Sequence, residues 1–136
     1  MPLLLQPRQG IPRLTVARTI AIIDDDEEVR TATENLVQSY GIDTLAFGSA
    51  EEFLNSVATQ NVACVITDIQ MPGMSGAELQ KTLLKQGRNL PIIFITAFPE
   101  ERVRRQVEAA GAICFLSKPY AADALMGSIS KALGGL

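Results

Sequence analysis

Short apolar runs alternate along the chain with longer stretches in which apolar residues recur at helical spacing. The apolar runs occupy residues 20–23, 44–47, 62–67, 92–96 and 113–116. After the first run, the mainly apolar residues between Val29 and Tyr40 recur at the three- and four-residue spacing that places them on one face of a helix. The pattern predicts five strands, each followed by a helix, and the last helix runs from about residue 121 to residue 133.

Residues that favour helix ends bracket the predicted helices. Ser49 and Ser75 each precede a glutamate by three residues, which is the spacing of a capping box. Pro99 is expected to open the fourth helix, because proline is favoured in the first helical turn. Gly41 and Gly111 are expected to end the first and fourth helices, since glycine accepts the backbone conformation that terminates a helix.

Every predicted strand except residues 44–47 is almost continuously apolar. Such strands are typical of parallel sheets that helices cover on both faces. Right-handed crossovers between parallel strands then place helices on both sides of the sheet. We therefore expect an α/β fold built as a doubly wound parallel sheet.

The composition fits one globular domain behind a short leader. Of 136 residues, 47% are hydrophobic and 20% are charged, which excludes a disordered chain, a collagen-like chain, a disulfide-stapled miniprotein and a two-domain enzyme. Residues 1–18 hold three of the seven prolines and show no periodicity. We interpret them as a flexible leader and place the domain at residues 19–136.

Charge is unevenly distributed along the chain. The leader carries Arg8, Arg13 and Arg18 and no acid, so the rest holds nine basic and fifteen acidic residues. Because an acidic body repels a phosphate backbone, we expect a cation as partner and no direct contact with nucleic acid. Cys64 and Cys114 lack metal-binding spacing, and the chain has no signal peptide and no membrane span, which predicts a reduced cytoplasmic protein.

Polar residues interrupt the pattern where the predicted strands end. Asp24, Asp25 and Asp26 follow the first strand, and Asp68 ends the third. In an open α/β sheet the carboxyl ends of the strands form the binding crevice, so these acids are expected to meet. Carboxylates that crowd together become protonated or hold a cation, and Mg²⁺ suits such a site because it keeps waters and leaves room for phosphate oxygens.

Two further residues, Thr96 and Lys118, follow the fourth and fifth strands at the same edge. Taken singly, each candidate has an ordinary structural interpretation. The acids after the first strand could cap a helix, Asp68 could start a turn, Thr96 could border the core, and Lys118 could begin a solvated helix. Their joint placement at four strand ends is the specific signal.

Four motifs make the chain resemble the receiver domain of two-component response regulators over about residues 19–133. They read I-I-D-D-D, D-I-Q-M-P-G-M-S-G, I-T-A and S-K-P-Y. The resemblance implies a flavodoxin-like (βα)5 fold with strand order 2-1-3-4-5. It also implies that residues 19–136 are a receiver domain.

The resemblance implies a phosphoacceptor and a metal site. Asp68 would accept a phosphoryl group from a histidine kinase or a histidine phosphotransfer protein. Asp25, Asp68 and the backbone carbonyl of Gln70 would bind Mg²⁺, for which Mn²⁺ can substitute, and Asp24 would act through a water. Asp26 would only cap the helix. The Gln70 side chain would reach the water that removes the phosphoryl group.

It also implies a switch beside the phosphoacceptor. Lys118, Thr96 and Ala97 would contact the phosphoryl oxygens, and the bond from Lys118 to Pro119 would be cis. Thr96 and Phe115 would move together and change the surface formed by the fourth helix, the fifth strand and the fifth helix. That surface would bind a downstream protein. The sequence leaves undecided whether the same surface also forms a homodimer on phosphorylation.

Tyr120 stands where the family often has Phe, and we expect this change to affect packing only.

The leading hypothesis is a stand-alone receiver whose only chemistry is on its own Asp68, and therefore not an enzyme. One alternative is the receiver part of a longer DNA-binding transcriptional regulator. The other is a haloacid-dehalogenase-like phosphohydrolase. Asp24 and Asp26 fit the D-x-D of that second family, but Glu28 stands where it has Thr or Val.

Overall fold

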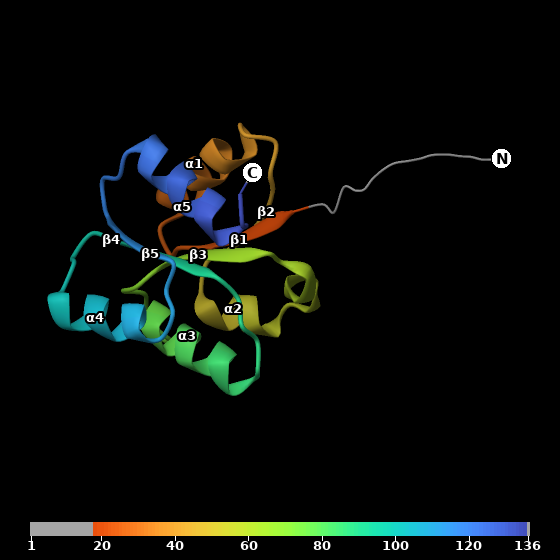
Figure 1. The fold of residues 1–136 in the computed structure, drawn as a ribbon. Helices are drawn as coiled ribbons and strands as arrows, with labels where there is room; N and C mark the ends of the chain where they lie inside the picture. Colours follow the sequence, from red (N-terminus) through yellow and green to blue (C-terminus); the bar gives the residue numbers. More distant parts are fainter. Residues whose placement is uncertain (1–17, 136) are drawn as a thin grey trace.

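A central five-stranded sheet is covered by helices on both faces (Figure 1). The computed structural model describes residues 18–135, so the leader expected at residues 1–18 lies, apart from Arg18, outside the described residues. The strands are β1 (Thr19–Ile23), β2 (Asp43–Phe47), β3 (Cys64–Asp68), β4 (Ile92–Thr96) and β5 (Cys114–Ser117). All pairings are parallel, and the order β2-β1-β3-β4-β5 confirms the predicted flavodoxin-like topology.

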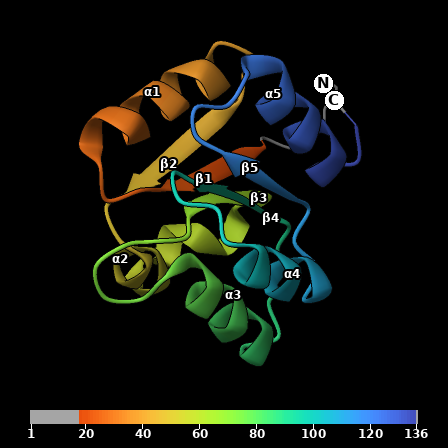
Figure 2. The same ribbon diagram turned by 90° about the vertical axis from the view of Figure 1, so that its left-hand side faces the viewer.

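Five α-helices connect the strands. They are α1 (Glu27–Gln38), α2 (Ala50–Asn55), α3 (Gly76–Lys85), α4 (Glu101–Ala109) and α5 (Ala122–Ala132), and a 3₁₀ helix, η1 (Val57–Asn61), follows α2. Helices α1 and α5 cover one face of the sheet, and α2, α3 and α4 cover the other (Figure 2). Within residues 18–135, no helix combines the length and the apolar character needed to cross a membrane.

The core has one apolar cluster on each face of the sheet. One cluster lies under α2, α3 and α4 and includes Phe53 and Phe94; the other lies under α1 and α5 and includes Val37 and Ile129. Strands β3 and β4 are buried along their whole length, as their apolar sequences predict. The apolar residues of β5 are only half-buried, because this strand lies at the edge of the sheet.

The predicted helix ends are only partly right. Ser75 and Glu78 form the expected capping box of α3. The Ser49 side chain caps α2 by accepting from the Glu52 N–H. The Glu52 side chain accepts from the Gly48 N–H (3.1 Å) and not from the Ser49 N–H, so only half of that capping box forms. The expectation that Pro99 opens α4 is wrong, because the helix begins at Glu101, and Pro99 belongs to the loop before it.

The start of α3 packs directly against the end of β3. A Cβ atom on Gly76 would collide with the carbonyl oxygen of Asp68, so only glycine allows this close approach. The Gly76 N–H also donates to the Ile69 carbonyl at 2.9 Å. The turn after Asp68 is therefore held tightly against the strand that carries this residue.

Candidate functional site

Three acidic side chains meet at the carboxyl edge of the sheet. Asp24 and Asp25 follow β1, and Asp68 ends the neighbouring strand β3. One carboxylate oxygen of each lies within 4.8 Å of the others. Asp24 and Asp68 are buried, whereas Asp25 is exposed. The prediction that the acids share one crevice is confirmed for Asp24, Asp25 and Asp68, and we call these three the acidic pocket.

Lys118 enters the acidic pocket from the loop after β5. Its ammonium donates to Asp68 Oδ2 at 2.9 Å and to Asp24 Oδ2 at 3.1 Å. Its backbone N–H donates to the Thr96 carbonyl at 2.8 Å, and the bond from Lys118 to Pro119 is cis. One lysine thus links the ends of β1 and β3 from a loop that follows the edge strand.

Burial and charge act against each other in this pocket. Burial raises the pKa of Asp24, although the Asp26 N–H at 2.9 Å and the Lys118 ammonium both favour its charged form. Burial lowers the pKa of Lys118, but its hydrogen bonds to Asp68 and Asp24 outweigh burial and leave that pKa raised. Lys118 is therefore a cation at neutral pH.

The charge balance of the acidic pocket fits a divalent cation. Three carboxylates in their ionised form face one ammonium, which leaves an excess of two negative charges. Oxygen ligands in this arrangement suit Mg²⁺, and the exposure of Asp25 leaves room for the waters that Mg²⁺ retains. The donor set thus fits the cation expected from the sequence.

Asp26 and Gln70 lie beside the acidic pocket with other contacts. Asp26 caps α1, because its side chain accepts from the N–H groups of Glu28 (3.0 Å) and Val29 (3.2 Å). The Gln70 N–H donates to Asp68 Oδ1 at 3.3 Å. A role of the Gln70 carbonyl as a metal ligand stays a prediction.

The residues expected to form the switch lie on and between β4 and β5. Thr96 is buried at the end of β4, and its Oγ1 accepts from the Phe98 N–H at 3.1 Å. Ala97 follows in an exposed position. Phe115 is half-buried on β5 and borders a cavity of about 270 Å³ that Arg104 of α4 also lines. There is thus space beside Phe115 on the side of α4.

Two contacts that support the site had no signal in the sequence. Glu51 of α2 accepts from the Met74 N–H at 2.9 Å and so holds the loop that follows Asp68. The Tyr120 hydroxyl lies 2.9 Å from Thr33 Oγ1 on α1, so the expectation that Tyr120 contributes packing only is wrong. Neither partner could be found from sequence spacing, because both contacts join separate helices and loops.

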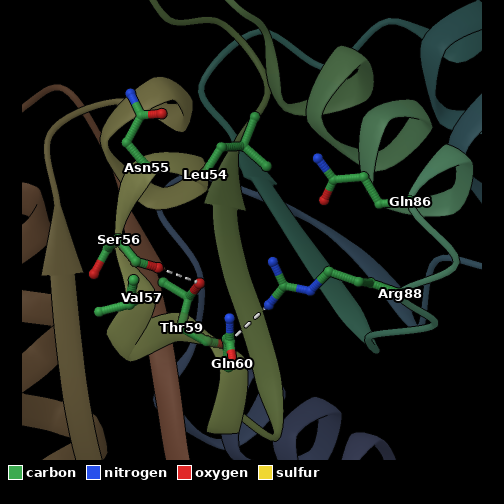
Figure 3. Close-up of a pocket in the computed structure, with 8 residues that line it drawn as sticks. All are labelled: Leu54, Asn55, Ser56, Val57, Thr59, Gln60, Gln86 and Arg88. Atoms are coloured by element: carbon green, nitrogen blue, oxygen red, sulfur yellow. Dashed lines mark hydrogen bonds between the residues drawn. The ribbon is translucent and has the colours of Figure 1, made fainter.

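A second cavity, of about 520 Å³, lies at the opposite edge of the sheet, between the α2–η1 segment and the loop after α3 (Figure 3). The guanidinium of Arg88 reaches from that loop to the Thr59 carbonyl at 2.9 Å. It also lies 5.7 Å from the centre of the Phe53 ring. These contacts join α2 and η1 to the loop after α3, so Arg88 has a structural role.

We predict that Arg88→Gln lowers the free energy of unfolding by about 1–2 kcal/mol, because it removes a charged hydrogen bond and a cation–π contact. Arg105→Gln is the matched control, since Arg105 is exposed on α4 and its one ion pair within residues 18–135 spans 4.0 Å. That control should change stability by less than about 0.5 kcal/mol. Urea unfolding followed by circular dichroism measures both, and equal effects would contradict the structural role of Arg88.

Comparison with known proteins agrees with the fold and the acidic pocket. A profile of the family described as "Response regulator receiver domain" matches residues 20–130. The response regulator protein TodT of Pseudomonas putida is 39% identical over 117 residues, which cover 86% of this chain and 52% of TodT. The response regulator protein TmoT of Ectopseudomonas mendocina is 40% identical over 114 residues, which cover 84% of this chain and 52% of TmoT.

Solved structures give the same result. The crystal structure of FixJ-N aligns with a TM-score of 0.79 at 29% identity and covers 90% of this chain and 98% of that one. The response regulator StyR aligns with a TM-score of 0.75 at 37% identity, over 88% of this chain and 60% of that one. The chain spans about half the length of the curated relatives it matches. The sheet order, the acidic pocket and the family match agree, and the chain belongs to the response regulator receiver domain family.

Proposed function

We propose that the protein is the phosphoacceptor of a two-component phosphorelay and that Asp68 receives the phosphoryl group from a histidine kinase or a histidine phosphotransfer protein. The observation that carries this proposal is the position of Asp68, buried at a strand end between two other carboxylates and bound by the Lys118 ammonium. A carboxylate repels an anionic phosphoryl donor, so it needs positive charge beside it to act as a nucleophile. Lys118 provides part of that charge.

In the proposed transfer, a carboxylate oxygen of Asp68 forms a bond to phosphorus. The bond between phosphorus and the histidine nitrogen of the donor breaks, and its electron pair stays on that nitrogen. The product is an acyl phosphate on Asp68. The Lys118 ammonium, already 2.9 Å from Asp68 Oδ2, then donates to the new phosphoryl oxygens.

We further propose that Asp25, Asp68 and the Gln70 carbonyl hold Mg²⁺, or Mn²⁺ in its place, and that Asp24 contributes through a water. When bound, the ion neutralises charge on the phosphoryl oxygens. Asp24 keeps a second task, because its carboxylate accepts from Lys118 and from the Asp26 N–H and so fixes the ammonium near the reacting carboxylate.

The switch is proposed to begin at Thr96. Its hydroxyl would turn from the Phe98 N–H towards the phosphoryl group, and the Ala97 N–H would donate to the same group. Phe115 would follow into space near α4, where a cavity already borders it. The α4–β5–α5 surface would then favour a downstream protein or a second copy of the chain, because phosphorylation biases two arrangements of this face.

A second candidate is the receiver part of a longer transcriptional regulator with a DNA-binding domain. One observation favours it: the chain spans about half the length of TodT and TmoT, and also half of the transcriptional regulatory protein TdiR of Thauera aromatica. The stand-alone receiver stays a prediction. The mass of the native protein, detected with an antibody against residues 18–135, separates the two.

Cys64 and Cys114 are both free thiols, which supports the proposal that the protein works in the reducing cytoplasm.

The phosphohydrolase alternative has less support. It needs Asp26 as a second reactive acid, whereas the Asp26 carboxylate caps α1.

Incubation with acetyl phosphate and Mg²⁺ tests the proposed function. We expect one base-labile phosphoryl group per chain, located at Asp68 by mass spectrometry. Continuous release of phosphate without a stoichiometric adduct would show an enzyme instead and overturn the proposal.

A further inference from the structure

The short connection between Lys118 and α5 has few contacts that fix its position. On its β-strand side, the Lys118 N–H is bound to the Thr96 carbonyl at 2.8 Å. On its helix side, Ala121 precedes α5 without a side-chain cap. Among the described residues, the hydrogen bond between the Tyr120 and Thr33 hydroxyls is the one hydrogen bond that ties this connection to α1.

The contact between Tyr120 and Thr33 is well placed to resist solvent. Thr33 is 3% exposed, and its hydroxyl lies 2.9 Å from the Tyr120 hydroxyl. The Tyr120 ring packs against the edge of the apolar cluster under α1 and α5, which directs its hydroxyl towards α1. In Figure 2 the connection after β5 approaches α1 before it enters α5. A buried hydroxyl that loses its partner is costly, so this contact favours one position of the loop.

Helix α1 also connects directly to the acids, which precede its first residue. It begins after Asp26, and Asp24 and Asp25 come directly before that cap. The hydrogen bond between Tyr120 and Thr33 therefore closes a ring that runs from the acids along α1, across to Tyr120 and back to Lys118. A second link in the same ring is the ion pair of Lys118 with Asp24 at 3.1 Å.

We propose that Tyr120 is a positioning residue that holds Lys118 at the correct distance from the acidic pocket through its hydrogen bond to Thr33. This inference rests on the proposed phosphoacceptor function. During transfer the ammonium must shift from Asp68 to the phosphoryl oxygens, so its contact with Asp68 no longer holds it, and Asp24 alone does not set its distance from the new group. The contact with α1 does not involve the reacting groups and persists throughout. Misplacement of a group that stabilises the transition state lowers the maximum rate.

Tyr120→Phe and Thr33→Val test the inference, because each removes one hydroxyl and keeps the shape of the side chain. Tyr40→Phe is the matched control, since Tyr40 is 52% exposed. With acetyl phosphate and Mg²⁺, we expect either single variant to reduce the maximum phosphorylation rate about threefold to tenfold. The half-saturating donor concentration should stay unchanged, and the double variant should be no slower than the slower single variant.

A general loss of stability would have a different result. It would give additive rate losses, or would change the half-saturating concentration as well, and either result would overturn the inference. A Tyr120→Phe rate equal to that of Tyr40→Phe would also overturn it. The NMR signal of the Lys118 ammonium provides a readout that needs no phosphorylation. It should broaden or shift in Tyr120→Phe and not in Tyr40→Phe. If the wild-type protein does not accept phosphate, the proposed function is refuted. The NMR signal still decides the role of Tyr120 in that case.

Discussion

Replacing Asp68 with Asn is expected to abolish phosphorylation by acetyl phosphate while the protein stays folded. An amide oxygen is a much weaker nucleophile than a carboxylate, and the neighbouring Asp24 is engaged by Lys118 and the Asp26 N–H. The fold should tolerate the change, because Asn still accepts from the Gln70 N–H and removes one of three crowded negative charges. Mass spectrometry of the intact protein should therefore find no adduct, and urea unfolding should give a free energy within about 1 kcal/mol of the wild type.

Asp26→Asn is the matched control for this experiment. It makes the same chemical change close to the pocket, at a residue whose side chain caps α1. Asn is as good as Asp at this helix position, so stability and phosphorylation should both be retained. A stoichiometric acyl phosphate on Asp68→Asn would show that another residue is the acceptor. Loss of phosphorylation in Asp26→Asn would show that the assay responds to any lost charge near β1.

The acidic pocket was predictable from sequence because its members follow a rule of topology. Strands that are parallel bring their carboxyl ends to one edge, so Asp24 and Asp68 had to meet once their strands were predicted to be neighbours. The position of Lys118 followed from the same rule, since it comes directly after β5. These predictions needed the positions of the elements along the chain and the strand order that the family resemblance implies, and no knowledge of side-chain contacts.

Contacts between separate helices and loops were not predictable in this way. Tyr120 and Thr33 lie 87 residues apart, and their contact depends on how α1 and the β5–α5 connection pack together. The same holds for Glu51, which reaches from α2 to the Met74 N–H in the loop after β3. Even the capping of α2 differs from its local pattern, since Glu52 accepts from the Gly48 N–H instead of the Ser49 N–H. Sequence periodicity describes which face of an element is buried, but it does not choose partners across the fold.

In the proposed site, Lys118 and a divalent cation would compensate the charges of different acids in the acidic pocket. The ammonium contacts Asp24 and Asp68, the two buried acids, and no ion pair of Asp25 is present among the described residues. Asp25 is thus the acid whose charge is least compensated by the protein. A cation that entered from solvent would meet this exposed carboxylate first, so we expect Asp25 to have the largest effect on the proposed metal binding.

Asp25→Asn is therefore expected to remove most of the stabilisation that Mg²⁺ gives the folded protein. A cation that binds only the folded state at a concentration of 100 times its Kd stabilises by about 2.7 kcal/mol. If loss of a carboxylate ligand weakens affinity about a hundredfold, the same Mg²⁺ concentration stabilises the variant by only about 0.4 kcal/mol. Without Mg²⁺ the sign reverses, and the variant should be slightly more stable than the wild type, because one of three mutually repelling carboxylates is gone.

Urea unfolding with and without Mg²⁺ measures both parts of this prediction. Asp43→Asn is the control, because Asp43 is an exposed acid at the start of β2, at the opposite edge of the sheet. It should keep the full response to Mg²⁺. An Asp25→Asn variant with the wild-type response would remove Asp25 from the metal site, and a wild type with no response would contradict a divalent cation in the acidic pocket. Reversal of the stability order between the two buffers distinguishes loss of a ligand from a general disturbance of the fold, which would lower stability in both.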